Sequence, residues 1–234
     1  MQQVSFEKIN KLDFRSNEAY KLLRTNIQFC GNDVREICFT SSMPNEGKSS
    51  VSFQLAASFA ENGKKVIFVD ADLRKSVIVG RYKPDHMVLG LTHYLSGQND
   101  LEEVVYHSNI ENLDIIFTGP VPPNPAELLG SECFSLLMQQ LRKDYDYVMI
   151  DTPPLGSVID SAIVAEHCDG IILVIEAKAI SYKITQRVKK QLEKGNCRIL
   201  GAVLNKVELN SKGYYGKYYG KYYGNYGNYG QQED

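Results

Sequence analysis

Short, nearly continuous apolar runs alternate along this chain with segments of helical periodicity. The runs of strand length cover residues 36–41, 65–70, 113–117, 147–151, 170–175 and 199–205. Such runs are typical of parallel strands that helices cover on both faces. The segments that favour helices are 47–62, 131–143, 157–167 and 181–194, several of which open on a serine that can cap the helix. The sequence therefore predicts an α/β domain with a doubly wound, mostly parallel sheet, in which ligands bind at the carboxyl ends of the strands.

Size and composition agree with one such domain. The chain has 234 residues, and its formal net charge of −2 gives no electrostatic reason to expect a nucleic-acid partner. The five cysteines form no C-x-x-C pair and the four histidines show no metal-ligand spacing, so we expect a reducing cytosol and no metal held by these residues. The sequence shows neither a signal-peptide core nor an apolar run of membrane-spanning length. We therefore expect any membrane association to come through a partner.

Two segments flank the alternating region. Residues 17–29 carry an apolar stripe (Leu22, Leu23, Ile27) that predicts a helix ahead of the first strand. From about residue 210 the hydrophobic periodicity stops, and residues 213–230 repeat glycine and tyrosine. Glycine at that density has a high entropic cost of ordering, which predicts a flexible tail. The expected division is an N-terminal segment (1–34), a central domain (35–209) and a tail (210–234).

The segment from Ser42 to Ser50, between a predicted strand and a predicted helix, contains Gly47-Lys48-Ser49. The backbone N–H groups of such a loop wrap phosphates at the positive end of the following helix. In that case Lys48 reaches the β/γ-phosphates and the Ser49 hydroxyl binds Mg²⁺. We expect the nucleotide to be held by Pro44, Asn45, Glu46, Gly47, Lys48, Ser49 and Ser50, although Ser42 stands where the first glycine usually is. The alternative is a strand–turn–helix junction that merely contains Gly-Lys-Ser.

Carboxylates end two further predicted strands. Asp70, Asp72 and Arg74 follow the second strand, and Asp151 ends the strand that begins at residue 147. Alone, Asp-x-Asp is more often a turn or a helix cap, but beside a P-loop strand such carboxylates can orient Mg²⁺ and its waters. An apolar strand ending in one aspartate is the Walker B layout, in which the acid holds a Mg²⁺-bound water.

These three motifs, in this order and followed by a terminal tyrosine cluster, resemble the bacterial tyrosine kinases of capsule and exopolysaccharide synthesis. The match is to the split version, in which the kinase is a separate soluble chain activated by a transmembrane adaptor. The resemblance implies an ATP- and Mg²⁺-dependent kinase with Ser49, Asp72 and Asp151 at the metal. It assigns the base to Asp70, with Asp72 as the alternate, and leaves Arg74 either to stabilise the transferring group or to anchor its loop. A cytoplasmic location at the cell membrane and a cognate phosphatase are implied as well.

The same family carries an oligomerisation motif, E-x-x-R-x-x-R, which corresponds here to Glu18, Lys21 and Arg24. Lysine at 21 keeps the charge but loses the bidentate fork of arginine. The alternative is an ordinary surface helix with i,i+3 ion pairs. The resemblance implies that the chain forms a ring-like homo-oligomer and that the tail is its own substrate. The expected phosphoacceptors are Tyr214, Tyr215, Tyr218, Tyr219, Tyr222, Tyr223, Tyr226 and Tyr229.

A rival interpretation is a ParA/MinD-like ATPase that acts as an assembly switch. Such proteins have a signature lysine in the phosphate-binding loop, at the place that Met43 occupies here. A third interpretation is non-enzymatic, with the nucleotide serving only as a switch for assembly and the tail as an adhesive tether. Asn205, at the end of the last predicted strand, is placed either to contact the adenine or simply to cap the strand.

Overall fold

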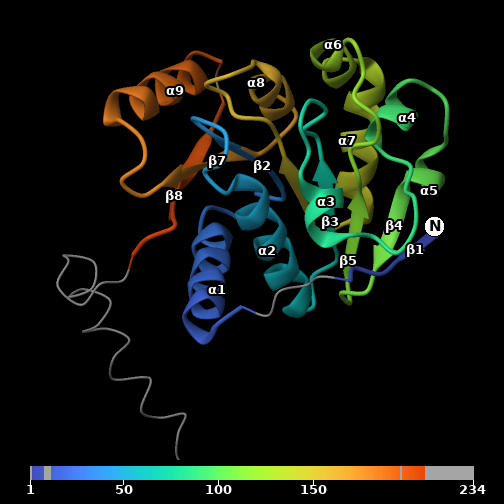
Figure 1. The fold of residues 1–234 in the computed structure, drawn as a ribbon, viewed down its shortest axis with the longest axis horizontal. Coiled ribbons are helices and arrows are strands. Elements are labelled where there is room, and N and C mark those ends of the chain that lie inside the picture. Colours follow the sequence, from blue (N-terminus) through green and yellow to red (C-terminus); the bar gives the residue numbers. More distant parts are fainter. Residues whose placement is uncertain (1, 8–11, 196, 209–234) are drawn as a thin grey trace, which may run out of the picture.

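The computed structural model describes residues 2–7, 12–195 and 197–208, and within them it forms one eight-stranded sheet in the order β1-β4-β5-β3-β6-β2-β7-β8 (Figure 1). The six predicted strands are confirmed as β2 (Glu36–Ser41), β3 (Val66–Asp70), β5 (Leu113–Ile116), β6 (Tyr147–Asp151), β7 (Gly170–Glu176) and β8 (Ile199–Asn205). Among the described strands, only β4 (Val105–Ser108) and β5 pair antiparallel. The doubly wound, mostly parallel sheet predicted from the sequence is therefore confirmed.

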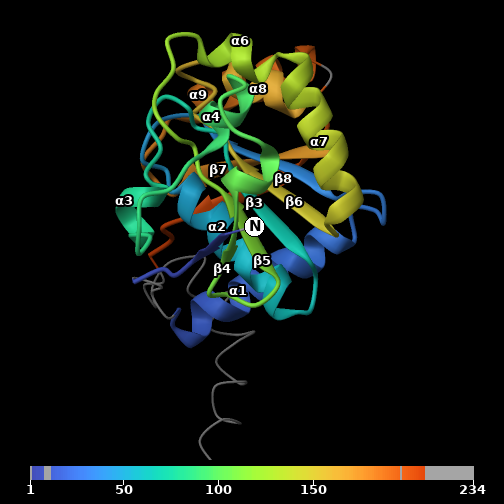
Figure 2. The ribbon, with the colours of Figure 1, turned by 90° about the vertical axis from the view of Figure 1, so that its right-hand side faces the viewer.

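Helices cover both faces of this sheet. The helices α1 (Phe14–Gln28), α2 (Lys48–Glu61) and α3 (Ile78–Tyr82) contribute to one apolar core. The other core takes residues from α4 (Leu91–Leu95), α5 (Leu101–Val104), α6 (Pro125–Leu129), α7 (Glu132–Asp144), α8 (Asp160–Ala165) and α9 (Tyr182–Lys194). Figures 1 and 2 both show α1 on the side of the sheet opposite to α6 and α8.

The central strands are buried on both faces because their side chains alternate between the two cores. In β2, Ile37 and Phe39 pack into the core under α1–α3, and Cys38 packs into the opposite core. All six residues of β2 are buried, which explains why its sequence is a continuous run rather than an alternating one.

Several elements differ from the sequence-based expectation. The short elements β1 (Gln2–Val4), α3, α4, α5, β4 and α6 were not predicted. Serine caps are confirmed at Ser131 and Ser181, whose side chains accept from Phe134 N and Lys183 N. The expected start of a helix at residue 157 is wrong: Ser157 N donates to the Pro154 carbonyl at 3.0 Å in a turn, and α8 begins only at Asp160.

The N-terminal helix α1 begins at Phe14, three residues before the predicted start, because the Asp13 carboxylate caps it by accepting from Ser16 N at 2.7 Å. The proposed tail, with its eight tyrosines, lies outside the described residues. Within the described part of the chain, no helix has both the length and the apolar character needed to cross a bilayer.

Candidate active site

The order of the strands brings the three sequence motifs together. In the sheet, β6 lies between β2 and β3, so the loop after β2 and the aspartates that end β3 and β6 meet at one edge. Asp70 and Asp151 are direct register partners on neighbouring parallel strands. Residues that are about 20 to 100 positions apart in sequence therefore share one site, at the carboxyl ends of the strands, where ligands bind in folds of this type.

The P-loop (residues 42–50) joins β2 to α2 and needs glycine at Gly47. That residue has φ +90°, in the left-handed region, and a Cβ there would lie 2.1 Å from Asn205 Nδ2. Any other residue at this position would be strained and would collide with the Asn205 amide. Asn45 also has a positive φ of 70°, which asparagine tolerates better than most residues. The loop conformation is thus specified by its own residue types.

Glu46 braces the P-loop from inside. Its carboxylate oxygens accept from Met43 N at 2.5 Å and from Glu176 N, at the end of β7, at 3.0 Å. Burial raises the pKa of Glu46, and the backbone N–H donors partly oppose that rise. Because the Glu46 side chain is engaged within the protein, only its backbone is left to contact a nucleotide.

Lys48, at the start of α2, lies among the carboxylates. Its Nζ is 3.1 Å from Asp72 Oδ2, 3.3 Å from Asp151 Oδ2 and 3.1 Å from Ser49 Oγ. Burial alone would lower the pKa of Lys48, but the charges of Asp151 and Asp72 outweigh it and raise the pKa above its ordinary value. Lys48 is therefore a charged counter-ion to two carboxylates.

Asp70 lies deeper and has no such ion pair. It is fully buried, and burial followed by the charge of Asp151 raises its pKa to about 8. Its oxygens accept from the Ser76 hydroxyl and, at 3.4 Å, from Asp72 N. The pKa of Asp151 is also raised by burial, against the opposing charge of Lys48. Three carboxylates thus face a single ammonium group.

This donor set fits a divalent cation. Asp72, Asp151 and the Ser49 hydroxyl offer the oxygen ligands that Mg²⁺ prefers, and the carboxylates exceed the positive charge that Lys48 supplies. The Asp151 carboxylate is oriented by the Ser52 hydroxyl, which donates to its other oxygen at 3.2 Å. All three of these oxygen donors lie around Lys48 Nζ, where a nucleotide-bound metal would need them.

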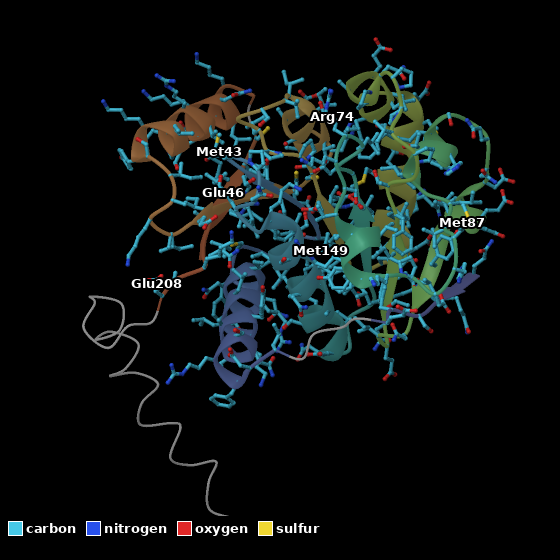
Figure 3. All side chains as sticks on the ribbon, viewed as in Figure 1. Met43, Glu46, Arg74, Met87, Met149 and Glu208 are labelled. Atoms are coloured by element: carbon cyan, nitrogen blue, oxygen red, sulfur yellow. The ribbon has the colours of Figure 1, made fainter. Side chains whose placement is uncertain are left out.

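Arg74 is held by α8. Its Nε and Nη2 donate to the two oxygens of Asp160 at 2.7 and 2.9 Å, a bidentate pair whose carboxylate is fully buried. Figure 3 shows Arg74 on the α8 side of the site and Glu46 on the side of β7 and β8. Of the two roles left open for Arg74, this contact matches the anchoring of its loop.

Asn205 and its neighbour Lys206 lie against the P-loop. The Asn205 amide donates to the Glu46 carbonyl at 2.9 Å, and Lys206 Nζ donates to the Asn45 carbonyl at 2.7 Å while pairing with Glu176 at 2.8 Å. In this state the end of β8 fastens the loop, and the Asn205 amide nitrogen is engaged with protein.

The residues expected to make subunit contacts lie on α1, away from the site. Glu18 and Lys21 pair with each other at 2.8 Å, which is the i,i+3 pair of an ordinary surface helix. Arg24 donates to the Ser58 carbonyl and to its hydroxyl, so it fastens α1 to α2. These contacts within one chain leave the predicted assembly role untested.

Sequence reasoning missed several residues that shape the site. Thr118 Oγ1 donates to the Asp72 carbonyl at 3.2 Å, Ser76 contacts Asp70, and Asp160 holds Arg74. No local motif marks these residues, because each is brought to the site by a different loop at the carboxyl edge. The strand order, which the sequence does not predict, brings Thr118 and Asp160 to the site, whereas Ser76 lies in the same loop as Asp70 and Asp72.

Fold and site together define a P-loop nucleotide-binding protein of the α/β class, and the family model described as "AAA domain" matches residues 34–199. The tyrosine-protein kinase CpsD of Streptococcus agalactiae is 39% identical over 219 residues, which are 94% of this chain and 92% of that protein. The chain therefore belongs to the family of bacterial tyrosine kinases, as its motifs indicated.

Solved structures agree with this assignment. The kinase domain of Escherichia coli tyrosine kinase ETK is similar with a TM-score of 0.77 and 32% identity, over 85% of this chain and 79% of that one. The septum site-determining protein MinD from Pyrococcus horikoshii OT3, complexed with Mg-ADP, has a TM-score of 0.62 and 26% identity, over 76% of this chain and 72% of that one. The fold is thus shared with a nucleotide-binding ATPase class as well as with kinases.

Proposed function

We propose that the protein transfers the γ-phosphoryl group of ATP to protein tyrosine, chiefly to the eight tyrosines of its own tail. The observation that carries the proposal is Lys48, which lies within 3.3 Å of carboxylates from two other motifs. That geometry puts the phosphate-binding loop and the acidic groups in one place. Phosphoryl transfer depends mainly on positioning and charge neutralisation, which such a site can supply.

On nucleotide binding, Lys48 turns from Asp72 and Asp151 to the β/γ-phosphate oxygens. The backbone N–H groups of the P-loop hold the phosphates at the start of α2. Asp72, Asp151 and Ser49 would hold Mg²⁺, which neutralises charge on the phosphate oxygens when it is bound. The movement of Lys48 exchanges one set of anionic partners for another, so its charge is compensated in both states.

In the transfer step, the tyrosine oxygen forms a bond to the γ-phosphorus while the bond from that phosphorus to the ADP oxygen breaks. The tyrosine proton passes to a carboxylate, which we assign to Asp70, with Asp72 as the alternate. Burial raises the pKa of Asp70 to about 8, so this carboxyl holds its own proton below that pH. It would act as the base once the charge of bound Mg²⁺ has lowered that pKa and released the proton. Asp70 is fully buried in this state, so the acceptor hydroxyl reaches it once Lys48 has moved.

The tail also offers a means of regulation. Each phosphotyrosine adds about −1.5 to −2 charges at neutral pH, which across eight sites far exceeds the formal net charge of −2. We propose that unmodified chains associate through Glu18, Lys21 and Arg24 and offer their tails to neighbours, and that heavily phosphorylated chains repel one another. A transmembrane adaptor would recruit the protein from the cytoplasm to the membrane, and a phosphatase would remove the phosphate groups from the tail. The process served is synthesis and export of an extracellular polysaccharide.

The second candidate, an ATPase that switches assembly, is favoured by the similarity to MinD. Met43 in place of the signature lysine and the tail of tyrosines weigh against it.

Incubation with Mg²⁺ and γ-labelled ATP separates the candidates. The kinase proposal predicts label on tyrosine. Release of labelled phosphate with no label on protein would support the ATPase, and retention of all the label on ATP would support a non-enzymatic switch.

A further inference from the structure

Arg81, on α3, reaches the first turn of α2. Its Nη1 donates to the hydroxyl of Ser50, the last residue of the P-loop. The first turn of the helix after a P-loop faces the phosphates, and Ser50 directly follows the expected metal ligand Ser49. A guanidinium group therefore lies beside the place where the polyphosphate would bind.

Three other cations around the P-loop are paired with carboxylates. Lys48 pairs with Asp72 and Asp151, and Arg74 pairs with Asp160. Lys206 pairs with Glu176. Among the residues that the structure describes, no carboxylate lies within salt-bridge distance of Arg81, and its Nη1 contacts a neutral hydroxyl. Arg81 is thus a cation beside the P-loop whose charge no carboxylate of the described residues balances.

The position of α3 is fixed from two sides. Tyr82 stacks on Phe53 of α2, with ring centroids 4.0 Å apart and planes at 28°. On the other side, the N-terminal segment holds the end of α3 through Glu7 N, which donates to the Lys83 carbonyl at 3.3 Å. Because Tyr82 is the next residue after Arg81, this packing holds the backbone of Arg81 in place beside α2, from which its side chain reaches Ser50.

We propose that Arg81 binds the part of the polyphosphate that ATP and ADP share, by exchanging the Ser50 hydroxyl for a phosphate oxygen. A phosphate oxygen is an anionic acceptor, unlike the Ser50 hydroxyl, and it adds charge attraction to the hydrogen bond from the guanidinium group. Arginine can also bind phosphate with two parallel N–H donors. The exchange is therefore favourable. This inference rests on nucleotide binding at the P-loop, which is part of the proposed function.

The test is the affinity for Mg²⁺–ADP and Mg²⁺–ATP, measured by isothermal titration calorimetry on the full chain. Arg81→Gln should weaken both nucleotides by a similar factor of about ten, and Arg81→Lys should lie between it and the wild type. The matched control is Lys83→Asn, which removes one positive charge two residues away. Lys83 has φ +47°, which asparagine accepts, and this variant should bind within about twofold of the wild type.

Wild-type affinity for ADP in Arg81→Gln would overturn the inference, and so would an equal loss in Lys83→Asn. If Arg81→Gln proves unfolded by circular dichroism, Arg81→Lys alone decides: ADP affinity equal to that of the wild type again overturns the inference. The readout does not depend on phosphoryl transfer. A wild type that labels no tyrosine, together with weaker ADP binding in Arg81→Gln, would contradict the kinase proposal and leave the role of Arg81 standing.

Discussion

Replacing Asp70 by asparagine should stabilise the unliganded protein while it removes the proposed base. Asp70 is fully buried among two other carboxylates, and its pKa is raised from 3.8 to about 8. The folded protein therefore keeps this proton up to about pH 8, whereas the unfolded chain releases it near pH 4. Folding takes up a proton in that window, so the free energy of unfolding that Asp70 contributes falls as pH rises from about 4 to about 8.

The magnitude follows from the shift. At pH 7 the unfolded chain has lost the Asp70 proton and the folded protein still holds it. The pH lies about three units above the ordinary pKa of 3.8, so Asp70 lowers the free energy of unfolding by on the order of 4 kcal/mol. Asparagine is neutral at every pH and can still accept from the Ser76 hydroxyl that contacts Asp70. Asp70→Asn should thus raise the free energy of unfolding at pH 7 by up to about 4 kcal/mol, and the gain should shrink toward zero near pH 4.

The assay is urea unfolding at several pH values, with a chelator present so that no metal binds the carboxylates. Asp160→Asn is the matched control, because it neutralises another fully buried aspartate that does have a cationic partner in Arg74. The free energy of unfolding of Asp160→Asn at pH 7 should fall by about 1–3 kcal/mol, because the substitution weakens a bidentate pair. This change is opposite in sign to the one expected for Asp70→Asn. An Asp70→Asn protein less stable than the wild type at pH 7, or a stability difference that does not change with pH, would refute the reasoning.

Three further predictions follow from the site and the helix α1. Lys48→Met should lose most ATP affinity and all phosphotyrosine. It should also be less stable than the wild type without Mg²⁺, because Asp72 and Asp151 lose their counter-ion; full phosphotyrosine in this variant would exclude the P-loop role. Alanine at Glu18, Lys21 and Arg24 together should give a monomer by light scattering, and an unchanged mass for a wild type already shown to be oligomeric would exclude the contact. Mixing Lys48→Met with a chain that lacks residues 210–234 should label the first chain with phosphotyrosine, and an unlabelled mixture would exclude transfer between subunits.

The fold could be predicted because the strongest signals are local. Continuous apolar runs identify buried parallel strands, and β2 and β6 have the predicted bounds. The short elements α3 to α6 could not be predicted, since helices of four or five residues show too little periodicity and depend on tertiary contacts. The N-terminal β1 was missed for the same reason: its three residues pair with β4, which is distant in sequence.

The site was predictable where its residues belong to local motifs. Lys48 and Asp151 belong to motifs whose chemistry requires those residues at those positions, so the sequence identifies them. Asp160, the partner of Arg74, belongs to no motif, and its pairing arises only when the loop after β3 and α8 approach each other. Arg81 itself belongs to no motif, although its partner Ser50 lies in the P-loop. The engagement of Glu46 and Asn205 in bracing the P-loop is likewise a property of the folded loop.

The central claim is that this site phosphorylates tyrosine with help from a carboxylate base. The most direct test is to incubate the wild type and Asp70→Asn with Mg²⁺–ATP and to map every phosphate by mass spectrometry, after showing that both proteins bind ATP. We predict phosphate on tyrosines within residues 210–234 of the wild type and almost none on Asp70→Asn. Equal phosphorylation of the two proteins, or a wild type that binds ATP and carries no phosphotyrosine, would contradict the account.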